Sequence, residues 1–276
     1  MKTVTLSTGD KVPMLGQGSW MMGERPERHA DEMAALREGV ELGMTLIDTA
    51  EMYGDGAAES LIGEALGDRR DELFLVSKVF PYNASVKRLQ TSCEASLRRL
   101  GTDRLDLYLL HWRGNVPLDE TIEGMEALQR AGKIRHWGVS NLDTDDMEDL
   151  VAAGGSACVT DQILYNLTRR GPEKELMPWL TEHDMAVMAY SPVEQGRLLD
   201  HPALAKIAQD MGASEAQVAL AWAMRDGRTI AIPKAGSVSH VRDNRKAADL
   251  VLDADQSAAL EAAFPQPARA TPLQML

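Results

Sequence analysis

The chain has 276 residues, of which 44% are hydrophobic and 26% are charged, and its formal net charge at pH 7 is −13. This composition is ordinary for a soluble globular protein, and the length suffices for one large domain. A charge this negative argues against a nucleic-acid surface and against attraction to an anionic membrane, so we expect neither partner.

Eight short apolar runs, spaced roughly thirty residues apart, each end in small or polar residues, and helical periodicity lies between them. The ends are Gly18–Trp20, Asp48–Ala50, Ser77–Lys78, His111–Trp112, Ser140–Asn141, Gln162, Tyr190–Pro192 and Pro233–Lys234. Alternating strands and helices predict a parallel sheet, and eight units predict a closed (β/α)8 TIM barrel. Active sites of such barrels lie at the C-terminal ends of the strands, so these residues share one candidate rim.

The start of the chain predicts a β-hairpin. Val4 and Leu6 alternate with polar residues, Gly9 and Asp10 form a turn, and residues 12–15 return. We expect this hairpin to close the bottom of the barrel.

Helices are predicted by apolar periodicity and by capping signals. The first spans about residues 26–42, and Ser214 and Gln217 form a capping box before a later apolar run. An extra C-terminal helix is predicted over residues 255–264, and the tail, 265–276, is expected to pack over the barrel. No linker or second domain is evident, so we predict a single domain over residues 1–276.

The cysteines and the N-terminus bear on location. Cys93 and Cys158 lack metal-ligand spacing, and a disulfide between them is not favoured in a chain this large without a secretory signal. We predict two reduced core thiols. No apolar run of 18 residues and no signal-peptide core occurs, which favours a cytoplasmic protein.

An acid, a lysine, a tyrosine and a histidine fall on the candidate rim. A buried lysine needs a partner, and Asp48 is the natural one for Lys78. Tyr53 follows Asp48 in a loop, where an adjacent ammonium would lower its pKa and make it a usable proton donor. His111 could hold a carbonyl oxygen. Each has a structural alternative: a buried ion pair, a loop tyrosine and a structural histidine.

A run of polar and basic residues follows the last strand, where barrels often bind phosphate. It comprises Lys234, Ser237, His240, Arg242, Arg245 and Lys246. A solvated helix face explains Arg245 and Lys246 equally well.

Together these residues resemble the Asp, Tyr, Lys and His tetrad of the aldo-keto reductase superfamily. The segments that carry the tetrad are Asp48-Thr49-Ala50-x-x-Tyr53, Ser77-Lys78 and Leu109-Leu110-His111. Further segments resemble the fifth-, seventh- and eighth-strand motifs: Gly132–Asn141, Tyr190-Ser191-Pro192 and Ile232-Pro233-Lys234. The resemblance covers essentially the whole chain, and Ile47–Tyr53 with Leu110–Trp112 look like bacterial methylglyoxal and small-aldehyde reductases.

The resemblance implies NADPH-dependent reduction of aldehydes or ketones, including small aldehydes such as methylglyoxal, by hydride transfer. It makes Tyr53 the general acid and Lys78 the cation that lowers its pKa. Asp48 would orient Lys78, and His111 would orient and polarise the carbonyl. No metal is required, and no HxH, HExxH or carboxylate cluster with metal-ligand spacing occurs.

The same resemblance implies a binding site for NADP(H), with NAD(H) tolerated. Ser140, Asn141 and Gln162 match the residues that hold the nicotinamide carboxamide, and Tyr190 matches the ring that stacks on the nicotinamide. The other matched positions lie in the loop over the pyrophosphate and around the adenosine: Ser191, Pro192, Gln195, Leu198, Lys234, Ser237, His240, Asp243 and Asn244.

Two positions depart from the family pattern. His240 stands where the family usually places an arginine against the 2′-phosphate, and Arg242 would face elsewhere on the helix, so we expect a modest preference for NADPH. Glu194 lies in the pyrophosphate loop and would repel phosphate unless turned outward.

The substrate pocket is predicted only in outline. Trp20, Tyr82 and Trp112 are candidates to line an apolar site for a small carbonyl, with core packing as the alternative for Trp112. Short loops favour an open mouth and broad aldehyde tolerance. We expect a monomer, with an oligomer left open.

Two other functions stay open at this point. A non-catalytic nicotinamide-binding sensor or structural member of the same superfamily would not need the intact tetrad. A phosphate-binding barrel isomerase using Lys78 and His111 would leave Tyr53 and Tyr190 unexplained.

Overall fold

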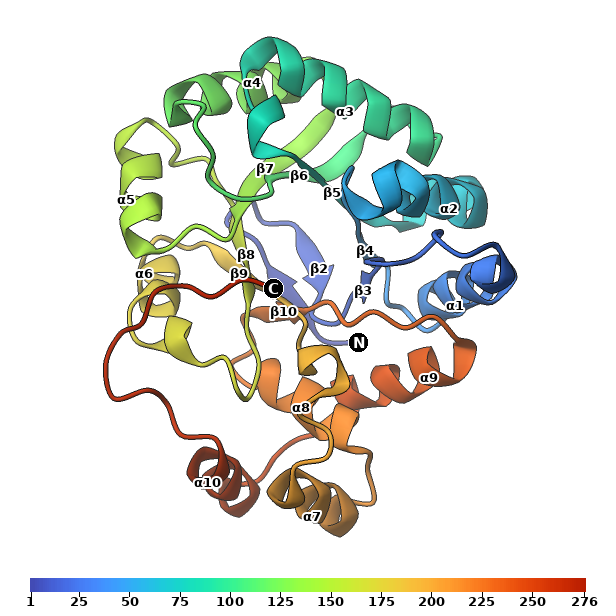
Figure 1. Ribbon diagram of the computed structural model, residues 1–276, viewed down its shortest axis with the longest axis vertical. Helices are drawn as coiled ribbons and strands as arrows, with labels where there is room; N and C mark the ends of the chain where they lie inside the picture. The colour runs from blue at the N-terminus through green and yellow to red at the C-terminus, as the bar shows by residue number, and fades with distance from the viewer.

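A computed structural model describes all 276 residues, and its centre is a barrel of eight parallel strands (Figure 1). The strands are β3 (Gln17–Gly18), β4 (Leu46–Asp48), β5 (Phe74–Val79), β6 (Leu105–Leu110), β7 (Ile134–Ser140), β8 (Thr160–Leu164), β9 (Ala186–Tyr190) and β10 (Thr229–Ala231). They follow chain order around the sheet, and parallel bridges from Leu15 to Ala231 and from Gly18 to Lys234 close it. The predicted (β/α)8 fold is confirmed.

Helices surround the barrel (Figure 1). They are α1 (His29–Glu41), α2 (Ala57–Leu66), α3 (Val86–Leu100), α4 (Leu118–Arg130), α5 (Thr144–Ala152), α6 (Leu176–Glu182), α7 (Pro202–Met211), α8 (Glu215–Ala223), α9 (Val238–Lys246) and α10 (Ala254–Ala263). A 3-10 turn over Pro26–Arg28 begins the predicted first helix. The capping box of Ser214 and Gln217 forms at α8, and α10 confirms the extra C-terminal helix.

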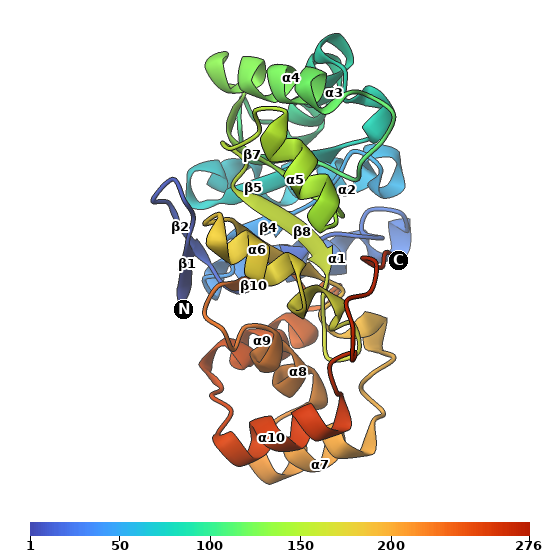
Figure 2. The same cartoon turned by 90° about the vertical axis from the view of Figure 1, so that its left-hand side faces the viewer.

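The N-terminal hairpin pairs β1 (Thr3–Thr5) with β2 (Lys11–Pro13) in antiparallel fashion. Val4, Leu6 and Val12 are buried against the apolar interior of the barrel. Figure 2 shows the hairpin at the end of the barrel opposite to the C-terminus. The sequence prediction of a hairpin under the barrel is therefore confirmed.

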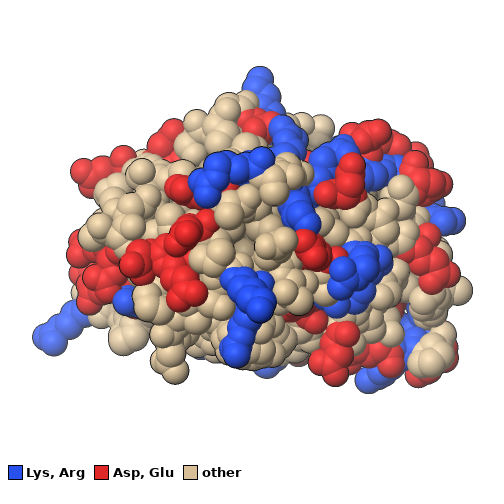
Figure 3. Space-filling view, turned by 90° about the horizontal axis from the view of Figure 1, so that it is seen from above, with Lys and Arg blue, Asp and Glu red and all other residues tan.

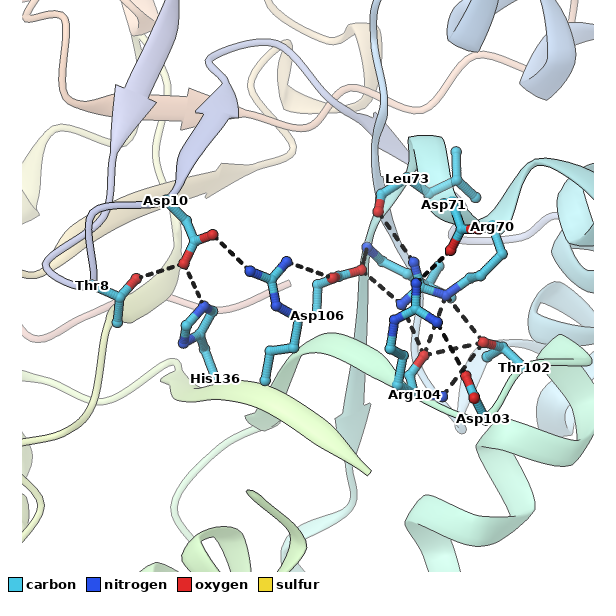
Figure 4. Close-up of polar contacts among 12 residues, drawn as sticks. Thr8, Asp10, Arg70, Asp71, Leu73, Thr102, Asp103, Arg104, Asp106 and His136 are labelled. Carbon is cyan, nitrogen blue, oxygen red and sulfur yellow. Dashed lines mark hydrogen bonds and ion pairs between the residues drawn. The ribbon is translucent and has the colours of Figure 1, made fainter. Parts of the chain in front are cut away.

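Ion pairs fix the hairpin turn to the barrel (Figure 4). Asp10 accepts hydrogen bonds from Thr8 at 3.1 Å and from Arg135 at 2.8 Å, and it lies 2.8 Å from His136 Nε2. Arg135 continues to Asp106 on β6 at 3.2 Å. Burial alone would raise the pKa of Asp10, but these hydrogen bonds and charges outweigh it and hold the pKa below its ordinary value.

Strand alternation explains why charged residues enter the barrel. Successive side chains of a strand point to opposite faces. Leu46 and Val76 belong to the apolar cluster inside the barrel. Two residues further along the same strands, Asp48 and Lys78 therefore also point inward, at the C-terminal end of the barrel. This geometry places the side chains of Asp48 and Lys78 next to one another inside the barrel.

The tail crosses that same end of the barrel (Figures 1 and 2). The Leu273 N–H donates to Asp143 at 2.8 Å, and Gln274 accepts a hydrogen bond from Arg169 at 2.7 Å. The expectation that residues 265–276 pack over the barrel is confirmed.

Both cysteines are buried free thiols, as predicted, and burial raises the pKa of Cys93 and of Cys158 to about 12. On the face over α3 and α4, Lys and Arg side chains are interspersed with Asp and Glu (Figure 3). None of the helices combines the length and the apolar character needed to cross a bilayer.

Candidate active site

Lys78 is the centre of the buried polar cluster. Its ammonium donates to Asp48 Oδ2 at 2.8 Å, to the Thr49 carbonyl at 2.7 Å and to the Tyr53 hydroxyl at 3.2 Å. Lys78 is fully buried and Asp48 is 2% exposed. The three donated bonds satisfy the ammonium and keep it charged inside the barrel.

The pKa of Tyr53 differs from the sequence expectation. Burial is the largest influence and raises the pKa, the charge of Lys78 lowers it, and the charge of Asp48 raises it. The net pKa lies above the ordinary value of 10. The expected lowering by Lys78 is present, but the expected net direction was wrong because the sequence did not show that packing around the phenol outweighs this charge. Tyr53 therefore carries its proton throughout the physiological range.

His111 lies beside this cluster as a neutral imidazole. It is 8% exposed, and its ring centroid is 5.9 Å from that of Tyr53. Burial and the charge of Lys78 lower its pKa to about 2. Its Nδ1 has no hydrogen-bond partner within the chain. A neutral imidazole carries one N–H, which can donate a hydrogen bond to an oxygen.

A hydrogen-bonded row of amides and hydroxyls joins the cluster from the far side of the barrel. The Tyr190 hydroxyl donates to Asn141 Oδ1 at 2.9 Å, and Asn141 Nδ2 donates to Ser140 Oγ at 3.0 Å. Ser140 Oγ donates to the main-chain carbonyl of Gln162 at 2.8 Å, and the side-chain Nε2 of Gln162 donates to Asp48 Oδ1 at 2.7 Å. The structure thus brings together all four residues that the sequence assigned to the nicotinamide end.

The loop after β9 has a contorted backbone. Ser191, Glu194 and Gln195 have positive φ values of 46°, 49° and 55°, which non-glycine residues adopt at a cost. Pro192 and Leu198 are buried and anchor the loop, while Gln195 is exposed.

Glu194 is neither turned to solvent nor free to repel an anion. It is buried and accepts hydrogen bonds from Asn166 at 2.7 Å, from Arg169 at 2.7 Å and from Arg197 at 3.0 Å. Burial opposes ionisation, but these partners prevail and lower the pKa of Glu194 to about 2. Two guanidinium groups therefore neutralise the carboxylate that departed from the family pattern.

The polar residues after β10 differ in how far they are exposed. Lys234 and His240 are exposed, Ser237 is half-buried, and Asn244 is buried. Ser237 is the N-cap of α9, and its Oγ accepts the His240 N–H at 3.5 Å. Lys234 and His240 have no acidic partner, so both side chains are free to meet an anion.

Two neighbouring residues of α9 are already engaged. Asp243 accepts hydrogen bonds from Ser214 Oγ at 2.6 Å and from Gln217 Nε2 at 2.5 Å, so both of its oxygens are used at the start of α8. Arg242, which was expected to face elsewhere than His240 on the helix, pairs with Glu38 at 2.7 Å. The bonds of Asp243 weaken its candidacy as a cofactor ligand.

A row of aromatic side chains packs next to His111. Tyr82 stacks on Phe80 with ring centroids 4.8 Å apart, and Phe80 meets Trp112 edge-on at 5.9 Å. The ring centroids of Trp112 and His111 are 5.0 Å apart. Trp20 and Tyr82 are 44% and 59% exposed, which is unusual for such large apolar side chains. The site therefore has an apolar rim.

Two residues of this region were not predicted from the sequence. Phe80 joins Tyr82 to Trp112, and its position directly after β5 was a usable signal. Arg169 pairs with Glu194 across 25 residues, and nothing in the spacing indicated that contact.

Comparison with known proteins identifies similar sequences and structures. Residues 14–264 match the Aldo/keto reductase family. The chain is 48% identical to methylglyoxal reductase YeaE of Escherichia coli, over 100% of this chain and 99% of that protein. It is 32% identical to methylglyoxal reductase DkgB of Escherichia coli O157:H7, over 91% and 92%. The crystal structure of an aldo/keto reductase from Klebsiella pneumoniae in complex with NADP and acetate superposes with a TM-score of 0.98, at 48% identity and over 100% and 99% of the two chains.

Proposed function

Since the chain belongs to the aldo/keto reductase family, we propose that it reduces small aldehydes and ketones to alcohols with NADPH, with methylglyoxal as the first candidate substrate. The observation that carries the proposal is the contact of the Tyr53 hydroxyl with the buried ammonium of Lys78 at 3.2 Å. A protonated phenol held by a cation is suited to give up its proton to a developing alkoxide.

The residues present fit a nicotinamide dinucleotide. Tyr190 is half-buried at the end of β9, where its ring can cover a planar group, and Asn141 stands beside it. Lys234 has no acidic partner and can meet a phosphate. When bound, NADPH supplies the hydride that adds to the carbonyl carbon.

The protein side of the reaction follows from the cluster. The neutral imidazole of His111 donates a hydrogen bond to the carbonyl oxygen and holds it near Tyr53. Tyr53 donates its proton to that oxygen as negative charge develops on it. Lys78 then stabilises the phenolate that remains, and this stabilisation is strong because the ammonium of Lys78 is shielded from solvent.

Asp48 and Gln162 position this machinery. Asp48 accepts a hydrogen bond from Lys78 through one oxygen, and Gln162 donates to the other oxygen of Asp48. The apolar rim of Tyr82 and Trp112 suits small neutral carbonyls.

The test is direct. Purified protein is mixed with NADPH and methylglyoxal, then with a panel of neutral and charged aldehydes, and the loss of the nicotinamide absorbance is followed. Tyr53→Phe serves as the matched control because it removes one oxygen from the site. Binding of NADPH without turnover of any aldehyde would instead support a non-catalytic sensor, which the intact tetrad disfavours. A cytoplasmic location and a monomeric state stay predictions.

A further inference from the structure

Arg28, near the start of the chain, lies beside the polar and basic residues that follow β10. It closes the 3-10 turn Pro26–Arg28 that precedes α1, and its Nη2 donates to the Gly236 carbonyl at 3.4 Å. The two residues are 208 positions apart. This hydrogen bond is the only one that the Arg28 side chain makes, so most of its five N–H donors are free.

The packing of α1 against α9 produces this meeting. The two helices lie side by side (Figure 1), joined by the pair of Arg242 with Glu38 and by a bond from Arg245 Nε to the Leu42 carbonyl at 3.1 Å. Both helices run back along the barrel, so both begin at the C-terminal end of the strands. Arg28 and Ser237 therefore lie at the same rim as the candidate active site.

Arg28 and Lys234 flank one point. A Cβ added to Gly236 would lie 3.1 Å from Arg28 Nη2 and 3.2 Å from Lys234 Nζ. Glu32 approaches the same point with its Cγ at 3.7 Å, but its carboxylate accepts the Gly23 N–H at 2.9 Å and pairs with neither cation. Two positive groups thus converge where no side chain separates them.

Neither cation has a carboxylate partner, although the chain contains 42 acidic residues. Each is exposed, and each makes no ion pair. Two converging, unpaired positive charges repel one another in the absence of an anion, and a dianionic phosphate would offset both.

We propose that Arg28 binds the 2′-phosphate of NADPH together with Lys234 and Ser237, and so replaces the arginine that is missing at His240. The inference rests on the proposed function and adds a residue that sets its cofactor preference. A guanidinium keeps its charge at any physiological pH, whereas an imidazole does not. The preference for NADPH is therefore stronger than the sequence suggested, and it persists above neutral pH.

Direct binding tests the inference. Dissociation constants for NADPH and NADH are measured by protein fluorescence in wild type, Arg28→Gln and Arg25→Gln. Arg25 is exposed, makes no hydrogen bond or ion pair through its side chain and precedes the same turn, so its variant removes the same charge and serves as the control. Calorimetry with adenosine 2′,5′-bisphosphate and with adenosine 5′-phosphate repeats the comparison without the nicotinamide.

We expect Arg28→Gln to weaken binding of NADPH and of the bisphosphate by about tenfold, and to leave NADH and adenosine 5′-phosphate unchanged. Arg28→Lys should recover part of the loss. Unchanged affinity for NADPH in Arg28→Gln, or equal loss for both cofactors, would overturn the inference while leaving the proposed function intact. Failure of the wild type to bind either cofactor would instead overturn the proposed function.

Discussion

Gln162 donates a hydrogen bond of 2.7 Å to Asp48 across the interior of the barrel, from β8 to β4. Because Asp48 also holds Lys78 at 2.8 Å, one carboxylate joins the row of amides at the candidate cofactor end to the proton donor. Each oxygen of Asp48 serves one of these two partners. We therefore expect cofactor position and acid catalysis to be coupled through this single side chain, so variants in this row should affect both.

Replacing Tyr53 by Phe removes the proposed acid and little else. We expect turnover to fall by about 10²–10⁴-fold, the usual contribution of general acid catalysis. Affinity for NADPH should stay near that of the wild type because the ring remains. Steady-state rates and fluorescence titration measure the two quantities. A variant that keeps more than about half of the wild-type rate would show that another group supplies the proton.

The partners of Tyr53 should shift its titration in opposite directions. The charge of Lys78 lowers the pKa of Tyr53 and the charge of Asp48 raises it. Reduction needs the protonated phenol, so activity is lost as pH rises through that pKa. Asp48→Asn should therefore move the alkaline limb of the rate profile to lower pH, and Lys78→Met should move it to higher pH.

The absolute rates should also differ between these two variants. Lys78→Met removes the cation that stabilises the phenolate, so it should cost more than Asp48→Asn, which removes only the residue that positions the cation. The full dependence of kcat on pH for both proteins is the measurement. Alkaline limbs that move together, or do not move, would contradict separate electrostatic roles.

The proximity of Asp48, Lys78 and Tyr53 was predictable because it depends on local order. Asp48 and Lys78 end neighbouring strands, and the closure of eight parallel strands makes such ends converge. The burial of Tyr53 was not predictable in the same way. The depth of a loop side chain depends on what covers it, and that determined the direction of its pKa.

The charged contacts between distant elements were also beyond the sequence. Arg28 meets Gly236 only because α1 packs against α9, and Asp243 turns to α8 because the capping box there offers two donors. Side-chain direction at such helix ends follows from tertiary packing, which apolar periodicity does not encode.

Arginine at position 240 should strengthen recognition of the 2′-phosphate. His240 is exposed at the start of α9, next to Ser237 and without an acidic partner. His240→Arg adds a permanent charge, and we expect it to tighten NADPH binding by about tenfold and leave NADH nearly unchanged. Combining it with Arg28→Gln should restore much of the lost affinity. Equal tightening of both cofactors would mean that position 240 does not face the extra phosphate.

Glu194 should control binding of both cofactors equally. It holds the contorted loop after β9 through Arg169 and Arg197, and Glu194→Gln leaves the half-buried Arg169 and the exposed Arg197 without their counter-charge. We expect NADPH and NADH to bind about tenfold more weakly, because the pyrophosphate is common to both. Glu182→Gln, at an exposed position with no side-chain bond, is the control. A loss confined to NADPH would place the effect at the 2′-phosphate instead.

The folded state should lose stability with rising pH because of Asp161. This residue of β8 is fully buried, points away from the barrel interior and has no charged partner, and only the backbone N–H groups of Leu142 and Asn141 partly offset its burial. Burial raises its pKa well above the ordinary value of 3.8. The unfolded chain therefore releases this proton at lower pH than the folded chain does. The contribution of Asp161 to the free energy of unfolding is therefore fully present below about pH 4. It is lost progressively as pH rises from there to the folded pKa.

Asp161→Asn removes this titration and keeps the shape of the side chain. We expect the variant to gain about 1–3 kcal/mol in the free energy of unfolding at pH 8, and less at pH 5. Urea unfolding at both pH values measures the difference. Asp106→Asn is the matched control, since Asp106 is equally buried in β6 but pairs with Arg70 at 2.8 Å and accepts the Leu75 N–H at 2.9 Å. That variant should be destabilised at both pH values. A gain for Asp161→Asn that does not grow with pH would show that the wild-type carboxyl finds a partner in solution.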